Sequence, residues 1–486
     1  MKMPTTPFIL VEITRKTATN LNPNLEDSNM FKESLRSFFT SIPPSWRFAV
    51  IAFVVLRGFY AIWSFVILAF YPLIVQNFEM NNLPGVLTFS LRTSQGAIYL
   101  RDVDGQALTF RPIDVDFMSD TQTGSIWDVK TGESVNGAYK GKSLRSNPEM
   151  VENFFPYRGV KPYSTAWLAI WQRFDANWYL SIAEYGYGTS LGDFHFPPLF
   201  IFLIQIVGSL TGNFFIAGLL ISHLATLFTI KLLYDLFHEW MPASLAKRAI
   251  VYFLVFPTSF YLFSVYSEPV FLVFVLMYMQ AMKKKSWIWA GFWTFCAILT
   301  RLQAIALIPA LLYLIYQDKP FLRKPAHWVS LIFPVVAGLI YLFMRLQGGE
   351  KYVLPTNETE LHTYLALPWE SYWYALRTIM SGQASFVDFL NWFIATLFIF
   401  MLVIGWRKLP IEYSLYTAGS ILIMLSRIVE GQPLSGMSRF ALSLFPMFLL
   451  LGLIGEKPIL NRLILYPAIL LNLLLSIQFW VWGWVA

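Results

Sequence analysis

The stretch FAVIAFVVLRGFYAIWSFVILAFYPLIVQ, residues 48–76, contains a single charged residue, Arg57. A membrane hydrocarbon core about 30 Å thick is crossed by roughly 20 apolar residues of helix, so this stretch is long enough to span. The rest of the chain is similar: of 486 residues, 56% are hydrophobic and 13% charged, with a mean hydropathy of +0.53. Soluble domains carry about 25% charged residues. The composition therefore excludes a soluble enzyme, a disordered chain and a disulfide-stapled module, and it predicts a polytopic membrane protein.

Eleven apolar runs of this kind are candidate membrane spans. They lie at 48–76, 211–234, 249–266, 268–283, 286–301, 303–317, 327–345, 389–406, 411–427, 439–455 and 461–484. The apolar stretch 196–210 is interpreted as a short interfacial or re-entrant helix, which a membrane tolerates where protein covers it. The expected fold is an all-α polytopic membrane protein of about 11 transmembrane helices.

Lysine and arginine residues cluster on one side of the membrane under this count. The clusters are the N-terminal tail, Lys247-Arg248, Lys283-Lys284-Lys285, Lys319/Arg323/Lys324, Arg407-Lys408 and Lys457/Arg462. Since such residues are enriched in cytoplasmic loops, we expect the N-terminus inside and the C-terminus outside. The net charge of +7 is therefore attributed to cytoplasmic loops and not to nucleic-acid binding. No signal peptide is recognised, and we expect a prokaryotic plasma membrane in preference to the endoplasmic reticulum membrane.

The first outer segment is too long to be a simple connector. Between residues 78 and 150 apolar and polar positions alternate and turn dipeptides such as Asp104-Gly105 recur, which predicts a small β-rich extracytoplasmic insert. Binding of the acceptor or of a partner subunit is a hypothesis for this insert. We divide the chain into a cytoplasmic tail at 1–46, a first transmembrane helix at 47–77, the insert at 78–150, interfacial helices at 151–210 and a transmembrane bundle at 211–486.

The segment RFDANWYLSIAEYGYG, residues 173–188, follows the insert. Trp178, Tyr179 and Ile182 recur at helical spacing, so the segment is expected to form a helix on the membrane surface. Asp175 would begin this helix. It is either an N-cap residue or a carboxylate at the mouth of a membrane cavity.

This segment resembles the motif of the PIG-V-type (GPI mannosyltransferase II-like) family, which belongs to the GT-C class of membrane glycosyltransferases. The strings FPTSF at 256–260, YSEP at 266–269 and TRLQ at 300–303, and the segment 438–446, resemble later motifs of that family. The resemblance covers roughly residues 45–76 and 167–455. It implies a GT-C-like fold and inverting transfer of a hexose, mannose being favoured, from a polyprenyl-phosphate sugar donor to a lipid- or protein-linked glycan acceptor. The transfer would take place at the extracytoplasmic or lumenal face, with Asp175 as the general base.

Several charged residues are predicted to lie on the same membrane face as Asp175. The leaving group would be a lipid phosphate, whose growing negative charge suits the guanidinium fork of arginine. We therefore expect Arg301 and Arg439 to bind the donor phosphate. Arg57 is a third candidate, because a charge inside a span requires a partner in the bundle. A structural ion pair or a snorkelling charge is the alternative for each of them.

The remaining candidates are predicted to bind substrate. They are Glu268, Trp178, Tyr179, Glu184, His195 and Glu430. A solvated helix position and an ordinary loop histidine are the alternatives for Glu184 and His195. The five histidines show no ligand spacing, and the single cysteine, Cys296, excludes an internal disulfide or CxxC site. A divalent metal is compatible with this sequence, but no metal ligand is indicated.

Two other function classes fit a polytopic chain. A transporter or lipid flippase would concentrate its charged residues near the bilayer midplane. Here, Arg57 apart, the notable charges are predicted to gather at one face, which favours the enzyme. A non-catalytic membrane scaffold, with the insert as its binding module, is the third alternative.

Overall fold

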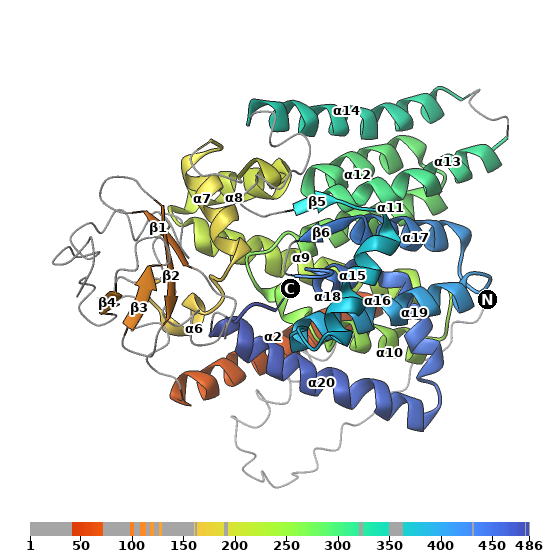
Figure 1. The fold of residues 1–486 in the computed structure, drawn as a ribbon. Coiled ribbons are helices and arrows are strands. Elements are labelled where there is room, and N and C mark those ends of the chain that lie inside the picture. Colours follow the sequence, from red (N-terminus) through yellow and green to blue (C-terminus); the bar gives the residue numbers. More distant parts are fainter. Residues whose placement is uncertain are drawn as a thin grey trace, which may run out of the picture. The chain divides into compact units, whose positions relative to one another are not determined.

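A computed structural model describes residues 41–70, 98–101, 107–112, 117–120, 126–128, 160, 163–188, 193–319, 324–348, 363–429, 432–481 and 483–485. The chain divides into a unit of residues 1–48 and a unit of residues 49–486. The described part of the larger unit is mostly helical (Figure 1).

Five described helices are long and apolar enough to cross a membrane. They are α2 (Pro44–Phe70), α9 (Phe214–His238), α14 (Pro325–Gln347), α16 (Phe386–Gly405) and α20 (Pro458–Trp480). A sixth candidate is a pair of helical segments bent by 83°, made of α18 (Met437–Phe440), η7 (Ala441–Ser443) and α19 (Phe445–Ile454). The chain is thus a polytopic helical membrane protein, as its composition predicts.

The other helices are shorter. They are α6 (Ala166–Ala169), α7 (Asp175–Tyr185), η3 (Asp193–His195), α8 (Pro198–Thr211), α10 (Ala243–Leu254), η4 (Ser259–Phe263), α11 (Glu268–Lys283), α12 (Trp287–Thr300), η5 (Leu302–Ala306), α13 (Leu307–Gln317), α15 (Pro368–Met380) and α17 (Ile411–Leu425). In the described residues, each of the eleven apolar runs overlaps one or more helical segments, and most of the stretch 196–210 belongs to α8. Which of the shorter helices cross the membrane stays a prediction.

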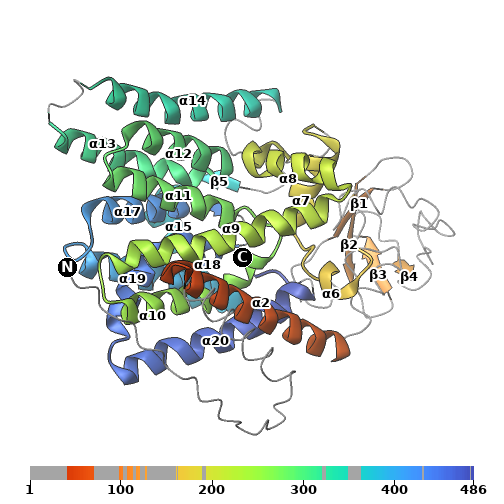
Figure 2. The same ribbon diagram turned by 180° about the vertical axis from the view of Figure 1, so that it is seen from behind.

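The surfaces of the outer helices suit hydrocarbon. In α14, Val335 and Phe343 are 60% and 64% exposed, and in α20, Leu463 and Leu470 are 63% and 67% exposed. Large apolar faces of this extent are expected against lipid and not against water. Helix α9 is more deeply buried and packs against α7, α8, α10 and α11, crossing the middle of Figure 2.

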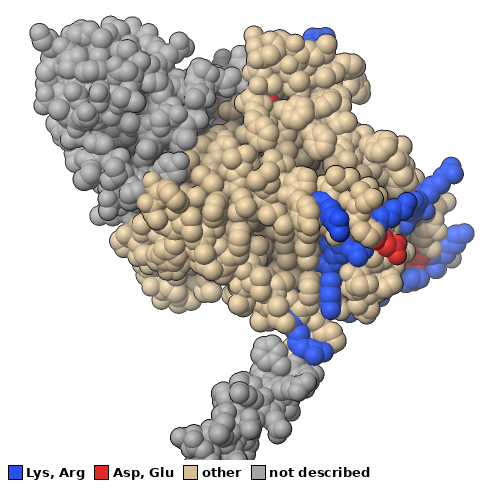
Figure 3. Space-filling model, turned by 90° about the horizontal axis from the view of Figure 1, so that it is seen from below, with Lys and Arg blue, Asp and Glu red and all other residues tan. Residues whose placement is uncertain are grey.

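Basic side chains gather at one end of the described surface in Figure 3, while most of the visible described face carries no charge. Asp318 connects two of the predicted cytoplasmic clusters, since its Oδ1 lies 3.6 Å from Lys285 Nζ and its Oδ2 contacts Lys324. Its Oδ2 lies 2.6 Å from Lys324 Nζ, 3.0 Å from His327 Nε2 and 3.0 Å from Trp287 Nε1. Hydrogen bonding by Lys324, supported by His327 and Trp287, holds the pKa of the Asp318 carboxyl well below its usual range.

One glycine sets the distance between α12 and α14. A Cβ atom on Gly291 would lie 2.5 Å from the backbone oxygen of Ser330, closer than atoms can approach. Small residues at helix crossings let backbones pack in this way in membranes. Gly291 therefore allows the closest approach between these two helices.

Two small antiparallel sheets complete the described structure. Strands β1 (Ile98–Arg101), β2 (Ala107–Pro112), β3 (Phe117–Asp120) and β4 (Ile126–Asp128) pair in sequence order within the predicted β-rich insert. Strand β5 (Thr363–Leu365) pairs with β6 (Arg427–Val429), with Leu365 opposite Arg427. The extracytoplasmic position of the insert stays a prediction.

Candidate functional site

Four of the predicted site residues form one chain of ion pairs. Nη1 of Arg439 lies 2.6 Å from Oδ2 of Asp175, and its Nε lies 3.2 Å from Oε1 of Glu268. Nη1 of Arg301 lies 2.6 Å from the same Glu268 oxygen. We call Asp175, Glu268, Arg301 and Arg439 the charge cluster. Its carboxylates and guanidinium groups alternate, so that Glu268 is shared by two arginines.

Each member of the charge cluster lies where a helix is interrupted. Asp175 and Glu268 are the first residues of α7 and α11. Arg301 is an extended residue between α12 and η5, and Arg439 belongs to the short α18 that precedes the 83° bend. Membrane proteins tolerate such breaks where protein or a cavity covers the backbone. The helix dipoles of α7 and α11 also favour a carboxylate in the first turn.

The start of α7 directs Asp175 into the cluster. The N-cap position belongs to Phe174, so Asp175 is not the cap. Phe174 has φ 50° and ψ −117°, a conformation that costs a residue with a side chain about 1–3 kcal/mol. Its ring packs against Phe479 and Trp484, with centroids 5.7 and 5.2 Å away. The Asp175 side chain keeps 19% of its surface exposed, which leaves it within reach of a ligand.

Hydroxyl groups connect α7 to the cluster. The hydroxyls of Tyr179 and Ser267 are 3.0 Å apart, and Arg301 donates to the Ser267 oxygen at 3.1 Å. The hydroxyl of Tyr266 accepts from the Asp175 backbone N–H at 3.2 Å. Burial raises the pKa of the Tyr179 hydroxyl well above its usual range, so this group stays protonated at neutral pH.

Aromatic rings cover the guanidinium groups. The Arg439 guanidinium carbon lies 5.5 Å from the ring centroids of both Tyr261 and Tyr266 and 4.9 Å from that of Phe440. The Arg301 guanidinium lies 4.6 Å from the same Phe440 ring. Such cation–π contacts stabilise a charge that has left water. Because the rings exclude water, solvent screens the arginine charges only weakly. These charges therefore act strongly on the other groups of the charge cluster.

Sequence reasoning missed a third arginine, Arg427, whose guanidinium lies 5.9 Å from the Phe440 ring centroid. The predicted span 411–427 includes it, whereas helix α17 ends at Leu425 and Arg427 begins strand β6. A charge at the end of an apolar run, the same signal that selected Arg301, could have found it. Burial and the neighbouring charge of Arg439 lower the pKa of Arg427 to about 10.

Other predicted site residues lie outside the charge cluster. Trp178 is 8% exposed and stacks on Phe196 at 5.3 Å. Glu184 is exposed near the end of α7, and the backbone oxygen of His195 accepts from the Tyr341 hydroxyl at 3.3 Å. Glu430 lies outside the described residues.

Arg57 belongs to a separate pair. Its Nε donates to Nε2 of His223 at 2.9 Å, and its guanidinium carbon lies 5.3 Å from the Trp171 ring. His223 Nδ1 lies 2.6 Å from the oxygen of Leu219, which fits a neutral ring with its hydrogen on Nδ1. The partner that we expect for Arg57 in the first span is thus His223 of α9. Neither residue belongs to the charge cluster.

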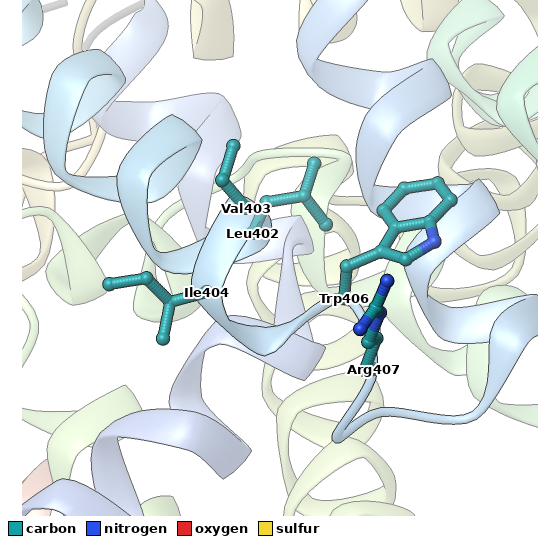
Figure 4. Close-up of a pocket in the computed structure, with 5 residues that line it drawn as sticks. All are labelled: Leu402, Val403, Ile404, Trp406 and Arg407. Carbon is teal, nitrogen blue, oxygen red and sulfur yellow. The ribbon is translucent and has the colours of Figure 1, made fainter.

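A surface hollow of about 480 Å³ lies at the end of α16, lined by Leu402, Val403, Ile404, Trp406 and Arg407. Figure 4 shows these side chains spread around the end of the helix. Substrate sites combine enclosure with convergent polar groups, and this lining offers neither. An aromatic and a basic residue at the end of an apolar helix are typical of a membrane–water interface. In the described ranges, no three His, Cys, Asp or Glu residues form a group that could hold a metal ion.

A comparison with protein families gives a match over part of the chain. Residues 195–343 match the family described as dolichyl-phosphate-mannose-protein mannosyltransferase, a stretch from η3 to α14 that includes Glu268 and Arg301. No protein of curated function and no solved structure matches the chain. The match supports a membrane glycosyltransferase of the GT-C class, while the PIG-V subtype rests on the sequence motifs alone. Over these residues, the chain is similar to membrane mannosyltransferases that act with a lipid-phosphate sugar.

Proposed function

We propose that this chain is an integral membrane glycosyltransferase of PIG-V type. It transfers a hexose, with mannose favoured, from a polyprenyl-phosphate sugar to a lipid- or protein-linked glycan acceptor at the extracytoplasmic or lumenal face. The observation that carries this proposal is the charge cluster, in which the accessible carboxylate of Asp175 lies 2.6 Å from an arginine. The family match over residues 195–343 supports the sugar and the lipid donor.

In the proposed reaction, Asp175 is the general base. The acceptor hydroxyl gives its proton to the carboxylate while its oxygen forms a bond to the anomeric carbon. The bond from that carbon to the phosphate oxygen breaks, and its electron pair leaves with the lipid phosphate. A single displacement of this kind inverts the anomeric centre. General-base assistance typically contributes 10²–10⁴-fold to the rate.

The pairing of Asp175 with Arg439 couples the two ends of this step. While Asp175 is ionised, it partly neutralises Arg439. Once Asp175 takes the acceptor's proton, the Arg439 charge becomes available to the leaving phosphate, which gains negative charge at the same moment. Glu268, with only 3% of its side chain exposed, holds Arg301 and Arg439 in place through the transfer.

The direct test is hexose transfer by detergent-purified protein from a short-chain polyprenyl-phosphate mannose, wild type beside Asp175→Asn. We expect the variant to lose activity by about 10²–10⁴-fold. Glu456→Gln, an exposed acid in the turn before α20, is the matched control and should keep full activity. Equal turnover by Asp175→Asn and wild type would refute the base.

The same assay separates the alternative functions. Turnover with glucose or arabinose donors, but not with mannose, would change the sugar and keep the reaction class. If no lipid-phosphate sugar is used while vesicles containing the protein move a solute or a lipid across the bilayer, the chain is a transporter or flippase. If neither transfer nor transport is found, the non-catalytic scaffold is the remaining alternative.

A further inference from the structure

The charges around Phe440 do not balance. The three guanidinium groups of Arg301, Arg427 and Arg439 approach this ring within 4.6–5.9 Å, and two carboxylates, Asp175 and Glu268, accompany them. Three positive and two negative charges leave one net positive charge among these described residues.

Arg427 carries the unbalanced charge. Arg439 and Arg301 each lie 2.6 Å from a carboxylate oxygen. Within the described ranges, Arg427 has no carboxylate partner, and its side chain donates only a long 3.5 Å hydrogen bond to the backbone oxygen of Ser435. The two arginines that the sequence favours as phosphate binders are therefore already paired, while the one that it missed is not.

Hydrogen bonds from β5 and α15 position the backbone around Arg427. None of these hydrogen bonds involves the Arg427 guanidinium group. Leu365 of β5 pairs with Arg427, and the adjacent Ala366 N–H donates to the Ser426 oxygen at 3.1 Å. The Ser371 hydroxyl of α15 donates to the Arg427 backbone oxygen at 3.3 Å. The β5–β6 pair and helix α15 thus fix the Arg427 backbone next to the Phe440 ring. Arg301 and Arg439 contact the same ring.

We propose that Arg427 binds the phosphate of the lipid donor. Its charge gives the five residues a net charge of +1, which matches a ligand with a single negative charge. This inference rests on the proposed function. A polyprenyl-phosphate sugar is a phosphodiester with one negative charge, which balances the net charge of the five residues. Transfer forms the acceptor–sugar bond, breaks the sugar–phosphate bond and moves the acceptor's proton to Asp175. The site then carries two net positive charges, which balance the dianionic lipid phosphate that is left.

Binding of sugar-free lipid phosphates tests this inference without any turnover. The probes are farnesyl phosphate, a dianion at pH 8 because its second pKa is about 6, and its methyl ester, a monoanion. We expect Arg427→Gln to weaken binding of both by about 10- to 100-fold, the scale of a hydrogen bond to a charged group. Arg427→Lys, which keeps the charge but loses the fork, should fall between. Arg377→Gln, an exposed arginine on α15, should bind like the wild type.

A second variant tests the charge balance in the opposite direction. Asp175→Asn raises the net charge by one and leaves Arg439 with Glu268 as its remaining carboxylate partner, so the variant should bind farnesyl phosphate about 10-fold more tightly than wild type. The double variant Asp175→Asn with Arg427→Gln should return to about the wild-type affinity. Wild-type affinity in Arg427→Gln, or no gain in Asp175→Asn, would overturn the inference.

The two proposals fail in distinguishable ways. If Arg427→Gln does not yield folded protein, the Arg427→Lys and Asp175→Asn affinities decide, since both variants keep a positive charge at position 427. If the wild type binds lipid phosphate with this charge dependence but transfers no sugar, the transferase is wrong and the anion site stands. If Asp175→Asn abolishes transfer while Arg427→Gln binds and turns over normally, the transferase stands and the role of Arg427 is wrong.

Discussion

Replacing Glu268 by Gln removes the one charge that two arginines share. Its Oε1 lies 2.6 Å from Arg301 and 3.2 Å from Arg439, and only 3% of the side chain is exposed. Gln keeps the shape of the side chain but leaves Arg301 without its carboxylate partner and Arg439 with Asp175 alone. The variant therefore tests whether the charge cluster is a mutually dependent unit.

The magnitude follows from burial. Removing one partner of a buried ion pair typically costs 3–5 kcal/mol, because the remaining charge stays unpaired in a medium that screens it poorly. Part of this cost is reduced here by the cation–π contacts of both arginines with Phe440, at 4.6 and 4.9 Å. We expect a loss near the lower end, about 3 kcal/mol. Because the unfolding entropy of a 486-residue chain is about 1 kcal/mol/K, this loss lowers the unfolding midpoint by about 3 °C.

The assay is thermal unfolding of the purified protein in detergent, followed by tryptophan fluorescence, with Glu456→Gln as the exposed control. Adding Arg301→Met to Glu268→Gln removes one unpaired charge and should restore part of the midpoint. An unfolding midpoint of Glu268→Gln within about 1 °C of the wild type would refute the reasoning. It would mean that water or movement of the arginines compensates for the lost carboxylate.

Two further predictions concern the stability of the bundle. Because the pKa of Asp318 is lowered in the folded protein, its contribution to stability is complete above about pH 4 and is lost as the pH falls towards its folded pKa. The unfolding midpoint of wild type should therefore drop between about pH 4 and pH 2 by more than that of Asp318→Asn, and parallel drops would contradict this. Gly291→Ala places a Cβ atom against the Ser330 backbone and should cost about 1–3 kcal/mol, measured as a lower midpoint of urea or thermal unfolding, whereas Gly338→Ala, where a Cβ meets nothing within 4 Å, should be neutral or stabilising.

Local signals in the sequence placed the helices well. The apolar run 268–283 and helix α11 share both ends, because Glu268-Pro269 begins the helix and the chain leaves it just after Lys283, where Lys285 takes a φ of 53°. Helix α17 ends two residues before the predicted limit, and this small error hid Arg427 inside a span. End positions depend on tertiary contacts, here the β5–β6 pairing, which hydropathy does not report.

The sequence predicts a common membrane face for the site residues, which stays a prediction, but it does not predict their contacts. Charge bias and span counting predict that Asp175, Glu268, Arg301 and Arg439 share one side of the membrane. They do not predict that Glu268 bridges two arginines, since this depends on how α11, α12 and α18 pack. The positive φ of Phe174 was equally out of reach, because sequence rules assign that conformation to glycine.

The distribution of charge along the chain bears on the choice between an enzyme and a transporter. A transporter needs polar groups near the midplane that can be reached in turn from both sides. The described charge in the middle of α2 is Arg57, and a neutral histidine engages its Nε at 2.9 Å while Trp171 covers its guanidinium. The charge cluster instead lies at the ends and breaks of α7, α11, α12 and α18, beside the β5–β6 strands. Each break gives up helical hydrogen bonds, and this cost is understandable where the breaks bring the proposed base and the proposed phosphate-binding groups together. That arrangement favours chemistry at one face over passage through the bilayer.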